Sequence, residues 1–357
     1  MIQTRSYVQE LGRLHQRMRD SIRSGQYIRG PVRLGALRCS DGRMRTFNRA
    51  IGVKPGQLFD MRAVGAKKSF LSYAFPDRLA DWLRRGGEHH VMFLTYHFDC
   101  IESKLGCKGH GFDTDAAIIA QIELAQDILD GFDEKIRPLV VGFDTRLEEL
   151  VLHGHNSSIR TRELGDQTMA TRILRELWPN LSVCIINELV PLFLHNSARV
   201  GKNVQNGWHE RQSDHQEVGM VIGRRIGWIV DEEDALQTVM IEDTTIHPNS
   251  EIALGIELLN NNLIEGRIPR EKGAFVFVCI PYLEREHRKA SSMVTARRWT
   301  ELTRCLVRKN APQIEKKLTY ITAVICEETR ELTILEGSSE DFEAFGTPHP
   351  LSLISRM

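Results

Sequence analysis

The sequence lacks the features that would assign it to a membrane or to nucleic acid. No uninterrupted apolar run approaches the length that spans a bilayer, and the first five residues lead into no apolar region of the signal-peptide kind. The charges balance, with 47 Lys and Arg residues against 47 Asp and Glu residues. No overall field then attracts a polyanion. We therefore expect a cytoplasmic protein without nucleic-acid or membrane partners.

The sequence also lacks the cysteine usage of a disulfide framework, because its seven cysteines are an odd number without a secretory context. Three of them lie in apolar, strand-like runs and are expected in the core: Cys184, Cys279 and Cys326. Three others lie among Gly, Asp, Ser and His: Cys39, Cys100 and Cys107. These three are the candidate metal ligands.

What is present is an alternation of short β-branched or aromatic runs with longer helical patterns. It is typical of an α/β fold with a mostly parallel β-sheet flanked by helices. The expected strands are 32–37, 58–61, 91–96, 139–143 and 182–186. Between the third and fourth of them, the pattern predicts a helix capped by Asp113 or Asp115 and stopped at Gly131. Its apolar stripe is expected at Ile118, Ile122, Ala125 and Ile128 or Leu129.

The 357 residues suffice for two domains, and the second half weakly repeats the first. The segments 218–223, 275–279 and 330–337 echo 34–39, 91–95 and 147–154 at nearly one offset, about 184 residues. A fixed offset favours duplication over coincidence. The polar segment 196–213, rich in Gly and Asn, marks a boundary between a first domain (31–213) and a second (214–357).

Residues 1–30 are expected to form an N-terminal amphipathic helical arm. Apolar residues recur there at helical spacing among many arginines: Tyr7, Leu11, Leu14, Met18 and Ile22. We expect this helix to pack on the second domain or on another subunit. An acidic partner is the alternative.

The motif Cys39-Ser40-Asp41-Gly42-Arg43 stands where a buried strand ends, which is where ligands bind in open parallel sheets. A thiolate at Cys39 can bind zinc, and Asp41 can accept a hydrogen bond from a hydroxide on the metal. Arg43 can hold that carboxylate through a charge-assisted pair. His97 and Cys107 follow the strand 91–96, and two thiolates with one imidazole leave a tetrahedral position open, as in catalytic zinc sites.

These motifs resemble a known family. Cys39-Ser40-Asp41-Gly42-Arg43 resembles the zinc-and-dyad motif of β-carbonic anhydrases, and residues 55–65 (Pro-Gly-Gln-Leu-Phe-Asp-Met-Arg-Ala-Val-Gly) resemble the segment that follows it there. Three further motifs resemble the carboxysomal shell carbonic anhydrase subfamily more closely: Tyr96-His97-Phe98, Gly106-Cys107 with His110-Gly111, and Val141-Gly142-Phe143-Asp144-Thr145.

The resemblance implies that Cys39, His97 and Cys107 bind zinc and that Asp41 and Arg43 form the catalytic dyad. The implied reaction is the reversible hydration of carbon dioxide to bicarbonate by a zinc-activated hydroxide. Carbonyl sulfide or carbon disulfide hydrolysis at the same site is an alternative. A non-catalytic zinc-binding scaffold or shell component is another.

Cys100 is an alternative third ligand, because His97-Phe98-Asp99-Cys100 has the His-x-x-Cys spacing of ordinary β-carbonic anhydrases. We prefer Cys107, since it is expected at the N-terminus of a helix, where the dipole favours a thiolate. His215 leads into the second domain as a histidine does in the carboxysomal subfamily. It is either a catalytic residue that relays protons or hydrogen-bonds bicarbonate, or a surface histidine in a linker.

Shifted by the internal offset, the three ligands fall on Gly223, Pro281 and Ser291, none of which binds zinc. The domain 214–357 is therefore expected to be a degenerate, metal-free copy of the zinc-binding catalytic domain. The resemblance also implies a homo-oligomer, with carboxysome components as partners. Because the zinc motif begins near residue 39, we expect the chain to lack the N-terminal domain of that subfamily.

Overall fold

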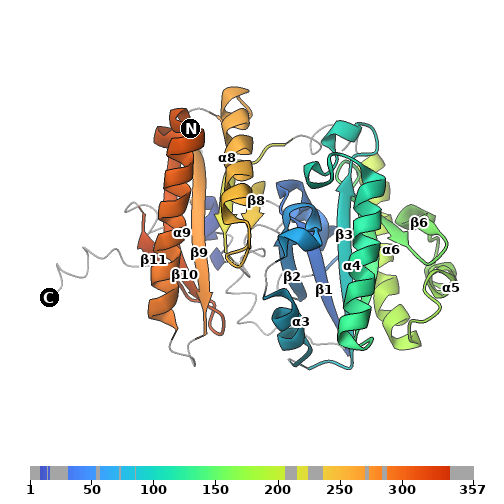
Figure 1. The fold of residues 1–357 in the computed structure, drawn as a ribbon. Coiled ribbons are helices and arrows are strands. Elements are labelled where there is room, and N and C mark those ends of the chain that lie inside the picture. The colour runs from blue at the N-terminus through green and yellow to red at the C-terminus, as the bar shows by residue number, and fades with distance from the viewer. Residues whose placement is uncertain are drawn as a thin grey trace. The chain divides into compact units, whose positions relative to one another are not determined.

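A computed structural model describes residues 9–13, 15–16, 31–53, 57–71, 74–84, 86–205, 215–223, 236–269, 273–283 and 288–337. The chain divides into two compact units: Tyr27–Asp214, and Met1–Gln26 with His215–Met357. We call them the six-stranded unit and the five-stranded unit after their sheets. Both sheets are mostly parallel and are flanked by helices (Figure 1), which confirms the predicted α/β class.

The six-stranded unit has the strand order β2-β1-β3-β4-β5-β6, in which β2, β1, β3 and β4 are parallel and the last two strands are antiparallel. The strands are β1 (Val32–Cys39), β2 (Leu58–Ala63), β3 (His89–Phe98), β4 (Ile136–Asp144), β5 (Glu149–His153) and β6 (Ser158–Arg160). The helices are α2 (Phe47–Ala50), α3 (Phe75–Arg84), α4 (Thr114–Phe132), α5 (Gln167–Leu177) and α6 (Val183–Gln205). Short 3-10 segments are η1 (Gly42–Thr46), η2 (Val64–Ala66), η3 (Lys68–Phe70), η4 (Ser103–Leu105), η5 (Lys108–His110) and η6 (Thr161–Glu163). The first four predicted strands are confirmed.

Strand alternation divides the core of this unit between two layers. Leu37 and Leu94 face α3 and α4, whereas the preceding residues, Ala36 and Phe93, face α2, α5 and α6. Both faces are therefore buried, as parallel sheets require. The rings of Phe47 on α2 and Phe93 on β3 meet edge to face at 6.2 Å, so α2 packs on the same face of the sheet as Phe93.

The predicted strand 182–186 is wrong, because this segment begins α6. Its buried residues recur at three- and four-residue spacing: Ile185, Ile186, Leu189, Val190 and Phe193. A short β-branched run looks the same in a buried helix as in a strand, and the later members of the series decide for the helix. Cys184 is accordingly half-buried rather than a core residue, whereas Cys279 and Cys326 are buried as predicted.

The helix α4 confirms the prediction between the third and fourth strands and selects Asp113 as its N-cap, since the Asp113 carboxylate accepts the backbone N–H of Ala116 at 3.0 Å. It ends at Phe132, one residue past Gly131. The predicted stripe is partly confirmed, because Ile128 is buried and Ile118 and Ala125 are partly buried against the core, although the most buried positions are Ala117, Gln121, Leu124 and Ile128. Ile122, expected inside, is 53% exposed.

The five-stranded unit has the strand order β11-β10-β9-β7-β8, with only β11 antiparallel. Its strands are β7 (Gly219–Ile222), β8 (Thr238–Ile241), β9 (Ala274–Tyr282), β10 (Leu318–Cys326) and β11 (Leu332–Glu336). Its helical segments include α8 (Pro248–Ile264), α9 (Lys289–Asn310) and η9 (Pro312–Lys317). The helices α8 and α9 pack on one face of this sheet.

The opposite face of the five-stranded sheet is covered in part by the N-terminal arm. Residues 9–13 and 15–16 are helical, and Leu11 is fully buried in a cluster with Phe277 and Ile321. The arm therefore packs on the second domain at Leu11, as predicted. The other stripe residues lie outside the described residues: Tyr7, Leu14, Met18 and Ile22.

The two sheets share one topology. The order β8-β7-β9-β10-β11 reproduces β2-β1-β3-β4-β5, with the same pattern of parallel and antiparallel neighbours. The helices α8 and α9 precede and follow β9 as α3 and α4 precede and follow β3, and each pair covers one face of its sheet. The internal offset in the sequence thus corresponds to a repeated fold.

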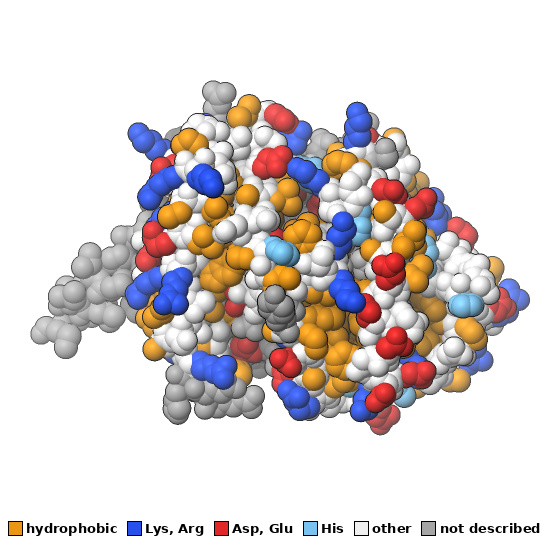
Figure 2. Space-filling model, in the orientation of Figure 1, with side chains coloured by type: hydrophobic (Ala, Val, Ile, Leu, Met, Phe, Trp, Pro, Cys, Tyr) orange, Lys and Arg blue, Asp and Glu red, His pale blue; other side chains and the backbone are white. Residues whose placement is uncertain are grey.

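The described surface shows no segregation of charge on the face in view, where basic and acidic side chains are interspersed on both units (Figure 2). This agrees with the balance of charges in the sequence. Within the described residues, no helix combines the length and apolar character needed to traverse a bilayer.

Candidate metal centre

Three buried side chains meet where β1 and β3 end in the six-stranded unit. Cys39 is the last residue of β1, and the backbone N–H of the next residue, Ser40, still donates to the carbonyl of Ala63, the last residue of β2. His97 is the next-to-last residue of β3, and Cys107 lies on the connection to α4. The ligand atoms of the three side chains lie within 4.8 Å of one another, and the two sulfurs are 3.8 Å apart. The structure therefore brings the three predicted ligands together.

This group fits a metal ion. His97 is 1% exposed, and neither of its ring nitrogens has a hydrogen-bond partner among the described residues. A buried polar group without a partner costs free energy, and a ligand bond to a metal would remove that cost. Two thiols and one imidazole are also donors that Zn²⁺ accepts, and they leave one tetrahedral position open. The Cys39-His97-Cys107 group can therefore hold a metal ion.

The two thiols share a hydrogen bond that separates their pKa values. The bond with Cys39 lowers the pKa of Cys107, and the backbone N–H groups of Gly109 and His110 act in the same direction against burial. The bond with Cys107 raises the pKa of Cys39, and burial adds to that rise. The thiolate of the metal-free pair is therefore favoured at Cys107. Metal binding has to displace the proton that Cys39 keeps.

The carboxylate of Asp41 stands beside this group and is held by Arg43. The guanidinium donates from Nε to Oδ1 at 3.0 Å and from Nη2 to Oδ2 at 2.7 Å, and the backbone N–H of Arg43 donates to Oδ1 at 2.8 Å. The Oδ2 atom lies 3.6 Å from Nε2 of His97. A bidentate arginine fixes both the charge and the direction of a carboxylate.

Arg43 also fixes the loop that carries Cys107. Its guanidinium donates to the carbonyl of Leu105, and Nη2 lies 3.4 Å from the carbonyl oxygen of Gly106. One buried side chain thus orients Asp41 and anchors the two residues before a metal ligand. Asp41 is the N-cap of η1 and Arg43 is the second residue of that segment, so one short turn sets the distance between them.

A second ion-pair network, centred on Asp60 of the neighbouring strand β2, supports the end of β1. The guanidinium of Arg38 makes two bonds to Asp60, at 2.7 and 2.6 Å, and Arg62 donates to Asp60 at 3.3 Å. Burial acts to raise the pKa of Asp60, but the two arginines outweigh it and the pKa is lowered. Arg62 also donates to the carbonyl of Cys39 at 3.1 Å. The backbone of this ligand is therefore tied to a buried ionic cluster.

Cys100, the alternative third ligand, lies outside the group. It is exposed, whereas Cys107 is 4% exposed and joins Cys39 and His97. Local burial and a hydrogen bond to Asp144 raise the pKa of Cys100 to about 12. Its position outside the group, and not its pKa, separates Cys100 from Cys39, whose pKa is also raised.

The setting of Cys107 differs from the one that the sequence suggested. The helix α4 begins only at Thr114, and Cys107 instead precedes the single turn η5. The backbone N–H groups that approach its sulfur belong to Gly109 and His110 of that turn. Local peptide dipoles, not the macrodipole of a long helix, therefore favour the thiolate.

Gly65 contributes to the site without having had a predicted role. Its backbone N–H donates to Cys39 Sγ at 3.2 Å, from a left-handed conformation with φ 64°. The sequence signal for such a turn is a glycine shortly after the strand that ends at Ala63.

His215 belongs to the five-stranded unit, before β7. Its Nδ1 atom lies 3.2 Å from Oε1 of Glu217, which is fully buried. Its catalytic role stays a prediction. The positions that the offset assigns to the ligands fall after β7 (Gly223), in β9 (Pro281) and in α9 (Ser291), and none offers a metal-binding side chain.

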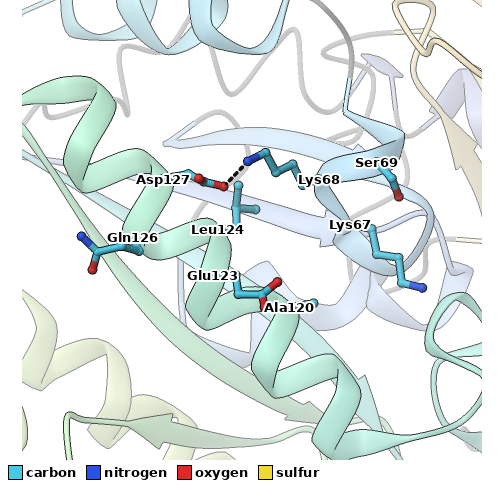
Figure 3. Close-up of a pocket in the computed structure, with 8 residues that line it drawn as sticks. All are labelled: Lys67, Lys68, Ser69, Ala120, Glu123, Leu124, Gln126 and Asp127. Atoms are coloured by element: carbon cyan, nitrogen blue, oxygen red, sulfur yellow. Dashed lines mark hydrogen bonds and ion pairs between the residues drawn. The ribbon is translucent and has the colours of Figure 1, made fainter.

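A separate hollow of about 530 Å³ lies between the segment 67–69 and α4 (Figure 3). It is lined by Lys67, Lys68, Ser69, Ala120, Glu123, Leu124, Gln126 and Asp127. The ammonium of Lys68 pairs with Asp127 at 2.6 Å across it. Its lining holds neither thiol nor imidazole, so it is not part of the metal centre.

No protein-family model and no curated protein matches this sequence.

Proposed function

We propose that the chain is a zinc enzyme of the β-carbonic anhydrase kind, which reversibly hydrates carbon dioxide to bicarbonate. One observation carries the proposal: a buried Cys-His-Cys group stands beside a carboxylate that an arginine binds through two nitrogens. The topology supports it, because Cys39 and His97 lie at the carboxyl ends of two parallel strands, where α/β folds place their sites.

Zinc is the metal that the donors favour, since thiolate and imidazole together select zinc over harder cations. Bound by Cys39, His97 and Cys107, it would lower the pKa of a coordinated water and so supply a nucleophile near neutral pH. Two thiolates donate more negative charge to the metal than two imidazoles would, so the bound water would be less acidic. The protein therefore has to supply further help in orienting and stabilising the nucleophile.

Asp41 gives that help in this proposal. Its Oδ2 atom lies 3.6 Å from His97, so a nucleophile in the open corner of the site is within its reach. Held as a carboxylate by Arg43, it can only accept a hydrogen bond, and it would turn the lone pair of the nucleophile toward carbon dioxide. Arg43 keeps Asp41 in place through both turnover and product release.

His215 is proposed to take up the proton that hydration releases. Glu217 orients its ring within the five-stranded unit. Replacing His215 by Ala should slow turnover in dilute buffer, and added imidazole should restore it by carrying the proton instead. Unchanged turnover in dilute buffer would remove His215 from the mechanism while leaving the metal site untouched.

The decisive experiment combines metal analysis with stopped-flow carbon dioxide hydration on the wild type and three variants. Wild type should contain equimolar zinc and hydrate carbon dioxide. Cys39→Ala and Cys107→Ala should lose both properties, because each removes a buried ligand. Cys100→Ala is the matched control and should keep both. Zinc-replete protein without hydration above background would refute the proposal.

A further inference from the structure

The loop that carries Cys107 touches the backbone of the loop after β2, whose Gly65 N–H donates to Cys39 Sγ. A Cβ atom on Gly109 would lie 2.7 Å from Cα and 2.8 Å from N of Gly65. Real side chains do not approach a backbone so closely, so Gly109 is required for the contact. Gly65 adopts φ 64°, which glycine accepts without steric cost. The segment η2 after β2 and the segment η5 after Cys107 are therefore pressed together.

A hydrogen-bonded chain crosses this contact. The imidazole Nε2 of His110 donates to the carbonyl of Gly65 at 2.7 Å, and the backbone N–H of Gly65 donates to Cys39 Sγ at 3.2 Å. His110 is 7% exposed. A carbonyl can only accept a hydrogen bond, so the nitrogen of His110 that meets it carries a proton.

His110 thus touches both sides of the metal centre. It follows Cys107 by three residues, and its backbone N–H approaches the Cys107 sulfur, whereas its side chain acts on the loop that meets Cys39. Both sulfurs receive backbone N–H donors. Such donors stabilise a thiolate and hold its lone pairs in one direction, which is what a metal ligand needs.

We infer that His110 is a positioning residue for the metal centre: its Nε2–H fixes the Gly65 carbonyl, and thereby keeps the Gly65 N–H on Cys39. The inference rests on the proposed function and adds a residue to it. His110 is not one of the three side chains whose ligand atoms converge, and its Nε2 is engaged by the carbonyl. Without it the buried Gly65 carbonyl would lose its partner. The φ and ψ of Gly65, which set the directions of both its carbonyl and its N–H, would then be held less firmly.

Substitutions that differ in one donor test this. His110→Gln can place an amide N–H where the imidazole Nε2–H lies, His110→Asn is one methylene too short, and His110→Met fills the space without a donor. The readouts are zinc affinity, by competition with a chelator, and the thiolate-to-Co²⁺ charge-transfer absorption of the cobalt-substituted protein. His155→Gln, at an exposed histidine of the same unit, is the control.

We expect His110→Gln and His155→Gln to behave as wild type. His110→Asn and His110→Met should bind zinc about 10- to 100-fold more weakly, the usual effect of losing a residue that supports a ligand, and their charge-transfer band should shift. Should His110→Met fail to fold, the Gln and Asn pair decides. Wild-type affinity and an unshifted band in His110→Asn would overturn the inference. Absence of metal binding in the wild type would instead overturn the proposed function.

Discussion

Cys39 Sγ and Cys107 Sγ lie 3.8 Å apart, and both residues are buried. A disulfide would need a separation of about 2.05 Å, so a shift of somewhat less than 2 Å closes the bond. The two sulfurs therefore have two alternatives: both can bind one metal ion, or an oxidant can join them as a disulfide.

Oxidation should therefore depend on the metal. Treating metal-free protein with diamide should link Cys39 to Cys107 and abolish zinc binding until a thiol reductant is added. The thiolate favoured at Cys107 adds to diamide, and the Cys39 thiol then attacks the Cys107 sulfur and releases the reduced reagent as a hydrazine. Protein loaded with zinc should resist. Peptide mass mapping measures the link. A link from Cys107 to Cys100 instead would contradict the geometry.

Replacing Asp41 by Asn should separate binding from turnover. The metal ligands are untouched, so zinc should remain, but an amide can present its N–H to the nucleophile and cannot keep the ionic pair with Arg43. We expect carbon dioxide hydration to fall by about 100-fold or more, the scale of a lost acid–base contact. Stopped-flow assays and metal analysis of the same sample measure both.

The matched control is Asp127→Asn, which removes a carboxylate from the exposed face of α4 where it pairs with Lys68. Hydration should stay at the wild-type rate there. If Asp41→Asn turned over as fast as this control, Asp41 would have no part in the chemistry.

The ligands of the site were predictable because topology forces them together. Cys39 and His97 end neighbouring parallel strands, and a parallel sheet brings such ends to one edge whatever the loops do. The support that Gly65 gives to Cys39 was not predictable. It depends on a positive φ and on the close passage of two loops, and a sequence without its fold gives neither.

The faces of helices were predicted less well than the strands. In α4 the apolar residues occupy two adjacent faces, and the buried one contains Gln121, whose side-chain amide donates to the carbonyl of Ala66 at 3.2 Å. A hydrophobic pattern ignores a buried glutamine, so it selected the face of Ile122. The prediction of a strand at 182–186 was wrong for a related reason, since five residues are too few to separate a period of 2 from one of 3.6.

The close contact between Gly65 and Gly109 can be tested through its effect on stability. Gly109→Ala should lower the free energy of unfolding by about 1–3 kcal/mol, because the new Cβ meets backbone atoms of Gly65 that cannot rotate away. Gly131→Ala is the control: its Cβ meets no described atom within 4 Å, and alanine should stabilise α4 there by about 0.5–1 kcal/mol. Urea unfolding of the metal-free proteins measures both. If the two substitutions changed the free energy of unfolding equally, the close contact between Gly65 and Gly109 would not be needed for stability.

The stability of the five-stranded unit should fall as the pH rises through neutrality, because of Glu251. This side chain is 2% exposed, and burial, reinforced by Glu242, raises its pKa to about 7 against an ordinary 4.5, although the hydroxyl of Thr245 donates to it at 2.7 Å. The folded state binds this proton more tightly than the unfolded state. The stabilisation is therefore complete below about pH 4.5 and is lost as the pH rises through about 7, on the order of 3 kcal/mol in all.

Glu251→Gln removes this titration while keeping an acceptor for Thr245. Unfolding free energies of wild type and variant, compared at pH 5 and pH 8 by urea titration, should differ little at the lower pH and should favour the variant at the higher one. The carboxylate has to ionise in a buried site above pH 7, and the amide does not. If the two proteins kept a constant difference across this range, Glu251 would be ionised in the folded protein throughout, and its burial would have to be offset by a cation.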